Sequence, residues 1–154
     1  MKKSQHISFE WQMIEHVVNI DVKSIDDKEK FSSGKFERMG VVILDDGETT
    51  FFKIQGIIFG IFDTKTEFTD VKSLGYIVFY FNDNSKIIAE ISGSEKVTST
   101  DQPRIFTGKG KFLKGTEKFK GIKGSFTFEG SYVDSSLDKS EQFSRTKLIG
   151  EYIL

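Results

Sequence analysis

One acidic residue on a predicted strand has the type and the position that acid–base chemistry would need. Glu15 lies in phase with Phe9, Trp11 and Met13, on the apolar side of a segment that alternates between apolar and polar residues. A carboxyl group enclosed among apolar side chains can act as a general acid. The competing interpretation places Glu15 at the exposed end of its strand, because ionised carboxylates are rarely buried unpaired. Glu15 is therefore the candidate catalytic residue.

Four further side chains could bind a ligand. Arg38 lies in phase with apolar residues of its own segment, so it could pair with Glu15 or bind a ligand carboxylate. Tyr76 and Tyr80 share a strand face and could offer hydroxyl groups to a molecule in a cavity, with the ring of Trp11 as part of the wall. The alternatives are an arginine at the rim and two tyrosines that pack with their hydroxyl groups at an edge.

Several other chemistries are excluded by the residues present. There is no cysteine, so thiol catalysis and cysteine-based zinc sites are excluded. His6 and His16 are too far apart in phase and position to bind one metal ion. The glycine run 108–115 fails the dinucleotide-binding pattern, because Leu113 stands where the third glycine belongs. We expect no metal and no cofactor.

Charge gives little support for nucleic acid as a partner. The chain carries 22 basic and 23 acidic side chains and a net charge of −1. The basic residues of the segment 109–123 alternate with glycine and phenylalanine, so they are expected to face water and not a nucleic acid.

The sequence also argues against a membrane span and a leader. No segment reaches the roughly 18 apolar residues that a membrane helix needs. The basic residues at positions 1–6 resemble the start of a signal peptide, but Glu10, Gln12 and Glu15 interrupt what would be its apolar part. We expect a cytoplasmic protein, with an exported protein trimmed of its leader as the alternative.

Apolar and polar residues alternate along most of the chain, which predicts strands. About eight are expected, at 7–20, 36–44, 50–62, 75–81, 86–93, 105–112, 125–132 and 146–154. The segments between them are expected to be loops, at 21–34, 64–73, 94–104 and 133–144. With 16 phenylalanines and glycines recurring inside strands, a curved sheet closed into a barrel fits better than a sandwich. We therefore predict an all-β protein, one antiparallel barrel domain spanning residues 1–154.

The second half of the chain carries a pattern of glycines and aromatic residues. It reads G-K-G-K-F at 108–112, then G-T-E-K-F-K-G-I-K-G at 115–124, and G-E-Y at 150–152. Over roughly residues 75–154 this resembles the allene oxide cyclase-like barrel superfamily, a calycin-like group with many bacterial proteins of unknown function. The resemblance implies an eight-stranded antiparallel barrel around an apolar cavity. A lipocalin-type carrier is the alternative fold, although Trp11 lacks the preceding glycine of the usual G-x-W start.

Three kinds of function remain open for such a barrel. The first is binding of a small apolar or amphipathic molecule in the barrel. The second is a cofactor-free cyclase or isomerase acting in the same cavity, since some members of the superfamily are cyclases. The third is a structural or interaction protein whose barrel is filled by phenylalanine. Binding is favoured over catalysis, because Glu15 is the single strand residue that offers acid–base chemistry.

Two predicted strands are apolar on both faces. These are 57–62 and 75–81, and one face of each must lie outside the barrel. Apolar surface of this kind is usually covered. No amphipathic helix is evident to cover it, so we expect a homo-oligomer, a dimer or a trimer.

Overall fold

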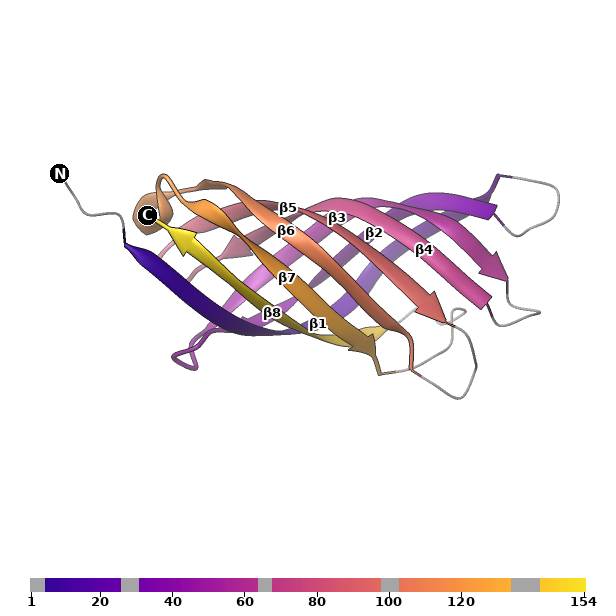
Figure 1. Cartoon of the computed structure of the whole chain (residues 1–154), viewed down its shortest axis with the longest axis horizontal. Helices are drawn as coiled ribbons and strands as arrows, with labels where there is room; N and C mark the ends of the chain where they lie inside the picture. The colour runs from indigo at the N-terminus through magenta and orange to yellow at the C-terminus, as the bar shows by residue number, and fades with distance from the viewer. Residues whose placement is uncertain (1–4, 26–30, 64–67, 98–102, 134–141) are drawn as a thin grey trace.

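Every strand of this protein pairs with the strand before it and the strand after it, and the last pairs with the first. The structure, a computed structural model, describes residues 5–25, 31–63, 68–97, 103–133 and 142–154. The strands are β1 (His6–Ser24), β2 (Phe31–Ile43), β3 (Thr49–Asp63), β4 (Phe68–Tyr80), β5 (Lys86–Val97), β6 (Ile105–Gly115), β7 (Lys123–Tyr132) and β8 (Phe143–Ile153). They form one closed antiparallel barrel in chain order (Figure 1). The predicted all-β barrel of about eight strands is confirmed.

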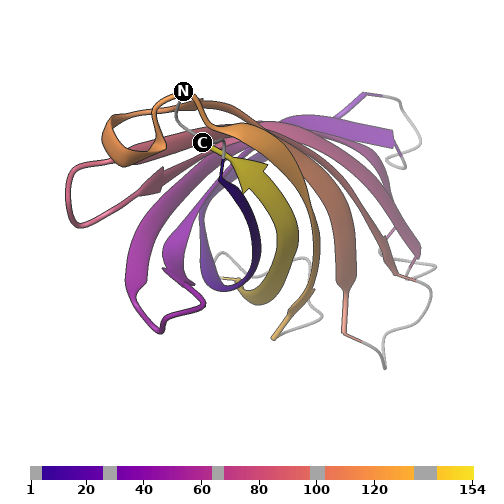
Figure 2. The same ribbon diagram turned by 60° about the vertical axis from the view of Figure 1, so that its left-hand side comes forward.

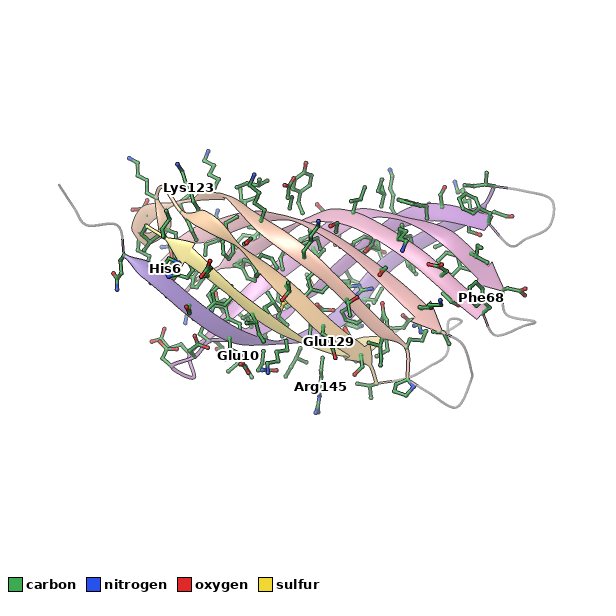
Figure 3. The ribbon with its side chains drawn as sticks, viewed as in Figure 1. His6, Glu10, Phe68, Lys123, Glu129 and Arg145 are labelled. Atoms are coloured by element: carbon green, nitrogen blue, oxygen red, sulfur yellow. The ribbon has the colours of Figure 1, made fainter. Side chains whose placement is uncertain are left out.

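Successive residues of each strand point alternately into the barrel and away from it, and this decides which side chains lie inside. Along β1, Phe9, Trp11, Met13 and Glu15 are buried, and the residues between them are exposed. The outward side chains include Lys123 and Arg145, which project away from the wall (Figure 3). Closure leaves no strand edge free to pair with another chain, which a phenylalanine-rich sheet could not safely expose.

Several strands are longer than the sequence indicated. Residues 21–24 pair with 32–35, residues 69–73 pair with both β3 and β5, and Phe68 pairs with β3, so the predicted loops at 21–34 and 64–73 are wrong at these positions. Residues 94–97 likewise continue β5. Within 68–73, Thr69 and Val71 are buried and Lys72 is exposed, so the alternation persists in a polar stretch. The remainders 26–30, 64–67, 98–102 and 134–141 lie outside the described residues.

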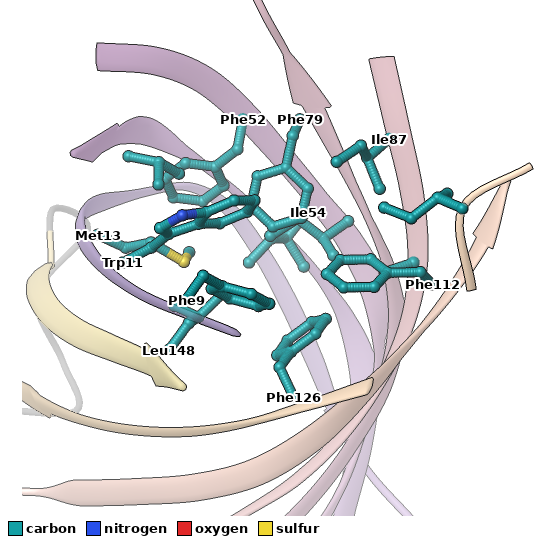
Figure 4. Packing of buried hydrophobic residues seen from close by; sticks show 14 of the residues in the cluster. Phe9, Trp11, Met13, Phe52, Ile54, Phe79, Ile87, Phe112, Phe126 and Leu148 are labelled. Carbon is teal, nitrogen blue, oxygen red and sulfur yellow. The ribbon is translucent and has the colours of Figure 1, made fainter. Parts of the chain in front are cut away.

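One half of the barrel interior is filled by aromatic and aliphatic side chains (Figure 4). The ring of Trp11 lies 4.3 Å from that of Phe9 and 5.5 Å from that of Phe79, measured between centroids. Phe79 is fully buried, and Phe52 is nearly so. Aromatic pairs at such distances stabilise a core beyond the area that they bury. We call this part the filled half, and the members of the core cluster that belong to it and do not line the cavity described below are Phe9, Trp11, Phe52, Phe79, Phe81, Ile87, Phe112, Phe119 and Ile122.

Two glycines of β6 make room for rings of β7. A Cβ atom on Gly110 would lie 2.1 Å from the ring of Phe126, and one on Gly108 would lie 2.2 Å from that of Phe128. The rings of Phe126 and Phe128 therefore pack directly on the backbone of β6. The steep curvature of the strands is visible in Figure 2.

The turn between β6 and β7 closes the filled half. It contains a short 3₁₀ helix, η1 (Glu117–Phe119), which lies at the same end of the barrel as the C-terminus (Figure 1). Phe119 is buried, and its ring lies 4.5 Å from that of Phe81. Gly121 follows with a φ of 90°, a conformation that favours glycine. The G-T-x-x-F-x-G segment thus closes a barrel end.

The turn between β4 and β5 depends on Asp83. Its Oδ1 accepts hydrogen bonds from the backbone N–H and the hydroxyl of Ser85, and its Oδ2 lies 2.9 Å from the Nζ of Lys118. Together, with Ser85 as the main cause, these contacts lower the pKa of Asp83 from its ordinary 3.8 to about 2.

We expect carboxyl NMR to show Asp83 titrating near pH 2, and Ser85→Ala to raise its pKa toward 3.8. Because the pKa is lowered by folding, the stabilisation is fully present above pH 3.8 and is lost as the pH falls through about 2. The Lys118→Gln variant is the control and should raise the pKa less. An unchanged pKa in Ser85→Ala would contradict this assignment.

The described part of the chain contains no helix long and apolar enough to cross a membrane.

Candidate functional site

A cavity lies inside the barrel, beyond the filled half. Its volume is about 60 Å³. The walls are mostly apolar, and the residues that line it are Met13, Glu15, Phe36, Arg38, Ile54, Ile58, Val71, Ser73, Ile77, Ile91, Gly93, Ser94, Glu95, Phe106, Thr107, Phe126, Phe128, Thr146 and Leu148. A dry cavity of about 150 Å³ binds benzene, and a water needs about 10–15 Å³. This cavity thus has room for a small organic group.

Glu15 reaches this cavity from β1 and is held by two neighbours. Its Oε2 accepts a hydrogen bond of 3.2 Å from Arg38 on β2 and one of 2.6 Å from the hydroxyl of Ser144 on β8. The register makes these contacts possible, because Glu15 lies opposite Ser144 on one side and opposite Gly40 on the other. A buried carboxylate needs such compensation, since its charge is costly to remove from water.

A second buried ion pair lies where β5 ends and β6 begins. The guanidinium of Arg104 donates to Glu95 at 2.8 Å and to the side-chain carbonyl of Gln142 at 2.9 Å. The backbone fixes both residues of the contact between Arg104 and Gln142, because the carbonyl of Arg104 accepts from the N–H of Tyr132 and the carbonyl of Gln142 accepts from the N–H of Val17. The ion pair of Arg104 thus depends on five segments that meet at the end of the barrel away from η1: β1, β5, β7 and the residues just before β6 and β8.

Tyr132 joins the two ion pairs. The guanidinium carbon of Arg104 lies 4.2 Å from the centre of its ring and that of Arg38 lies 5.2 Å from it. Arg38 also donates a hydrogen bond to the Tyr132 hydroxyl. Glu15, Arg38, Glu95, Arg104, Tyr132, Gln142 and Ser144 form what we call the polar cluster.

The cluster keeps the tyrosine neutral and Arg38 charged. Burial, opposed by the charge of Arg38, raises the pKa of Tyr132 to about 12. Burial also disfavours the charge of Arg38, but Tyr132 and then the carboxylates of Glu15 and Glu95 outweigh it, so the pKa of Arg38 lies above its ordinary value. At neutral pH the Tyr132 hydroxyl is therefore a hydrogen-bonding group and not an anion.

Two atoms at the cavity have no hydrogen-bond partner among the described residues. They are Nε of Arg38 and Oγ1 of Thr146, both buried and both on residues that line the cavity. The Nε of Arg104 also has no hydrogen-bond partner among the described residues, but Arg104 does not line the cavity. Buried polar atoms are nearly always paired, so these atoms are exceptions among the described residues, and each is shielded from water.

The structure brings together two of the predicted site residues. Glu15 is only 3% exposed and contacts Arg38, so the pairing that their phases allowed is present. The alternative of an exposed strand end is wrong for Glu15. The Arg38 side chain is 18% exposed and reaches the interior while lying over the rings of Phe36 and Phe106.

The other three predicted residues do not line the cavity. Tyr76 and Tyr80 are 58% and 38% exposed, on the outer face of β4, so the prediction that they offer hydroxyl groups to a cavity ligand is wrong. The strand face was misjudged because both faces of β4 are apolar, and its inward residues are Ile77 and Phe79. Trp11 is buried, but it packs in the filled half.

Sequence reasoning missed most of the polar cluster. Glu95 and Arg104 fall in a stretch predicted to be a loop, as does Ser144. A signal was present for Glu95, because it continues the alternation of Ala89 and Ile91 in β5. Nothing in the sequence around Tyr132 indicated its arginine neighbours.

The donors and acceptors of the cluster suit hydrogen bonding to an organic molecule. Within the described ranges, no group of three or more histidine, cysteine, aspartate or glutamate side chains could hold a metal ion. The arrangement instead places fixed polar groups at one end of an apolar cavity. That combination is typical of small-molecule sites.

No protein-family model and no curated protein matches this sequence. Among solved structures, a conserved protein of unknown function from Rhodopseudomonas palustris, RPA1785, aligns over 100% of both chains with a TM-score of 0.51 and 12% identity. The pterocarpan synthase dirigent protein GePTS1 aligns over 97% of this chain and 88% of its own with a TM-score of 0.45 and 14% identity. The pterocarpan synthase dirigent protein PsPTS1 aligns over 98% of this chain and 95% of its own, with a TM-score of 0.41 and 14% identity. The likeness to the Rhodopseudomonas protein is one of fold, and it supports assignment of this chain to the eight-stranded barrel proteins.

Proposed function

We propose that the barrel binds a small apolar or amphipathic molecule in its cavity. One observation carries the proposal: a mostly apolar cavity of about 60 Å³ inside the barrel is lined by the charged residues Glu15, Arg38 and Glu95 as well as by apolar side chains. A few fixed polar groups in a mostly apolar cavity are the usual composition of a small-molecule site. The site lies at the end of the barrel where Glu95 and Arg38 keep some exposure, 11% and 18% of their side chains, so it reaches the surface there.

Native mass spectrometry of the protein purified from cells tests this proposal. We expect a bound small molecule that is released on unfolding. Ser73→Leu should abolish its retention, because Ser73 lines the cavity on β4 and a leucine there fills the space. Lys72→Leu, at the neighbouring outward position, is the matched control and should keep the ligand. Equal retention by both variants would place the ligand elsewhere, and no bound molecule in the wild type would argue against binding.

A cyclase or isomerase in the same cavity is the second candidate. The observation that favours it is that the carboxylate of Glu15 lines the cavity. It would act on a flexible substrate that the walls hold in one conformation. The resemblance of β6, its following turn and β8 to the allene oxide cyclase-like superfamily supports the same proposal. Conversion of the released molecule by the wild type, with loss in Glu15→Gln, would distinguish catalysis from binding alone.

We also propose that the protein forms a homo-oligomer through the outer face of β3 and β4. Seven exposed apolar residues gather there: Phe51, Ile57, Phe59, Ile61, Leu74, Tyr76 and Tyr80. Several are neighbours across the strands, since Phe51 lies opposite Tyr80 and Ile57 lies opposite Leu74. In a dimer related by a two-fold axis, such an apolar face would pack against its own copy.

Light scattering should therefore give the mass of a dimer or a trimer, and Leu74→Glu should give a monomer, because it places a charge in the interface. Leu113→Glu is the control, since Leu113 is exposed to a similar degree, 45% against 47%, and lies on β6. A monomeric wild type would overturn this proposal and leave cavity binding unaffected.

A further inference from the structure

The side chain of Arg38 crosses the interior of the barrel. Its backbone lies in β2, and its guanidinium carbon lies 5.3 Å from the centre of the Phe106 ring on β6. In the closed strand order, β2 and β6 are opposite each other, because three strands separate them on either side. The guanidinium also donates hydrogen bonds to the carboxylate of Glu15 on β1 and to the hydroxyl of Tyr132 on β7. Partners on three other strands therefore hold Arg38 across the lumen.

Arg38 lies on the path between the cavity and the surface. Each strand is paired with both of its neighbours, so the described ladders leave no opening through the wall. At one end the filled half closes the interior, where the rings of Phe81 and Phe119 lie 4.5 Å apart beside η1. For the described part of the chain, the remaining entrance is the other end, where the Arg38 side chain is 18% exposed. Because Arg38 also lines the cavity, a molecule that enters there meets its guanidinium.

The contacts of Arg38 can break without unfolding the barrel. They belong to one side chain, whereas β2 is joined to β1 and β3 through its backbone. The guanidinium carbon lies 5.2 Å and 5.6 Å from the ring centres of Tyr132 and Phe36, distances at which an aromatic face attracts a cation. Unrestrained side chains change rotamer within nanoseconds, so these contacts set the rate at which Arg38 leaves the lumen.

We propose that Arg38 is a gate: a ligand enters or leaves the cavity when this side chain releases Glu15 and Tyr132 and swings out of the lumen. This inference rests on the proposed binding function and adds how the site is reached. Such a gate slows entry and release together, so weakening it should change exchange rates much more than affinity.

The first measurement needs no ligand. Nε of Arg38 is buried, so its N–H exchanges with water when the side chain moves, and NMR of the full chain gives that rate. Tyr132→Phe removes the hydroxyl and keeps the ring, and we expect exchange to become roughly tenfold faster, as for loss of one hydrogen bond to a charged group. Tyr152→Phe is the matched control and should change nothing, because the Tyr152 ring lies 6.3 Å from that of Phe119, beside η1. Unchanged exchange in Tyr132→Phe would overturn the gate.

The second measurement follows passage into the cavity with xenon as the probe. Xenon is a single apolar atom that binds in dry protein cavities, so it suits a volume of about 60 Å³. The methyl NMR signals of Ile54, Ile58 and Ile77, which line the cavity, report its binding and its exchange rate. We expect Tyr132→Phe to speed xenon exchange by the same factor as the N–H exchange and to leave the affinity unchanged. Equal xenon rates in both proteins would overturn the gate and leave the binding function standing. No methyl response to xenon would argue against both.

Discussion

Arg38→Met should lower the free energy of unfolding by about 3–5 kcal/mol, as removal of one partner from a buried ion pair usually does. The variant leaves the carboxylate of Glu15, which is 3% exposed, with Ser144 as its remaining hydrogen-bond donor among the described contacts. It also removes the donor to the Tyr132 hydroxyl. Urea denaturation followed by circular dichroism measures the change, provided that the slope with denaturant is the same in both proteins.

The double variant Glu15→Leu with Arg38→Met should recover most of that loss. Replacing both members of a buried pair with apolar residues leaves no uncompensated charge, and such replacements are often neutral. Arg145→Met is the matched control, because Arg145 is exposed on β8 and its removal should change stability by no more than about 0.5 kcal/mol. If the double variant is as unstable as Arg38→Met, packing of the arginine and not its charge stabilises this region.

The sequence predicted the part of the fold that depends on alternation within single strands. The inward positions of β1, including Glu15, follow from the residues alone. Strand ends were harder to predict, because residues such as Asp70 and Lys72 are polar and yet continue a ladder whose other face is buried. The face of β4 that carries Tyr76 was assigned to the interior, although it lies outside, because both faces of that strand are apolar.

Most of the site depends on contacts between strands that are distant in the chain. Arg38 and Tyr132 are 94 residues apart, and they meet because β8 pairs with β1 and closes the barrel. Glu95 and Arg104 are close in sequence, but their partner Gln142 is not. No pattern among neighbouring residues predicts contacts between residues so far apart in the chain. The polar cluster can therefore be recognised only after the register of all eight strands is known.

One part of the barrel interior stabilises the fold, and we propose that the other part binds a ligand. The aromatic residues packed near η1 exclude ligand from the filled half, whereas the cavity end holds charged groups whose burial adds little stability on balance. This division suggests that the two halves respond differently to substitution, and Phe79 is the residue that tests it best. It is fully buried, contacts Trp11, and does not line the cavity.

Phe79→Ala should lower the free energy of unfolding by about 3–5 kcal/mol, because it removes a buried ring and leaves a void in a part of the barrel that cannot collapse around it. Phe51→Ala is the matched control. Phe51 lies on the neighbouring strand with its side chain 65% exposed, so its loss should cost no more than about 0.5 kcal/mol in a single chain. Urea denaturation of both variants at a protein concentration that keeps them monomeric gives the comparison.

Below its unfolding transition, Phe79→Ala should still retain the molecule that native mass spectrometry finds on the wild type, because the residues that line the cavity are unchanged. A loss of that molecule from the folded variant would show that the aromatic packing positions the cavity and that the two halves are coupled. Equal destabilisation by Phe79→Ala and Phe51→Ala in the monomer would contradict the assignment of Phe79 to the core and of Phe51 to the exposed face.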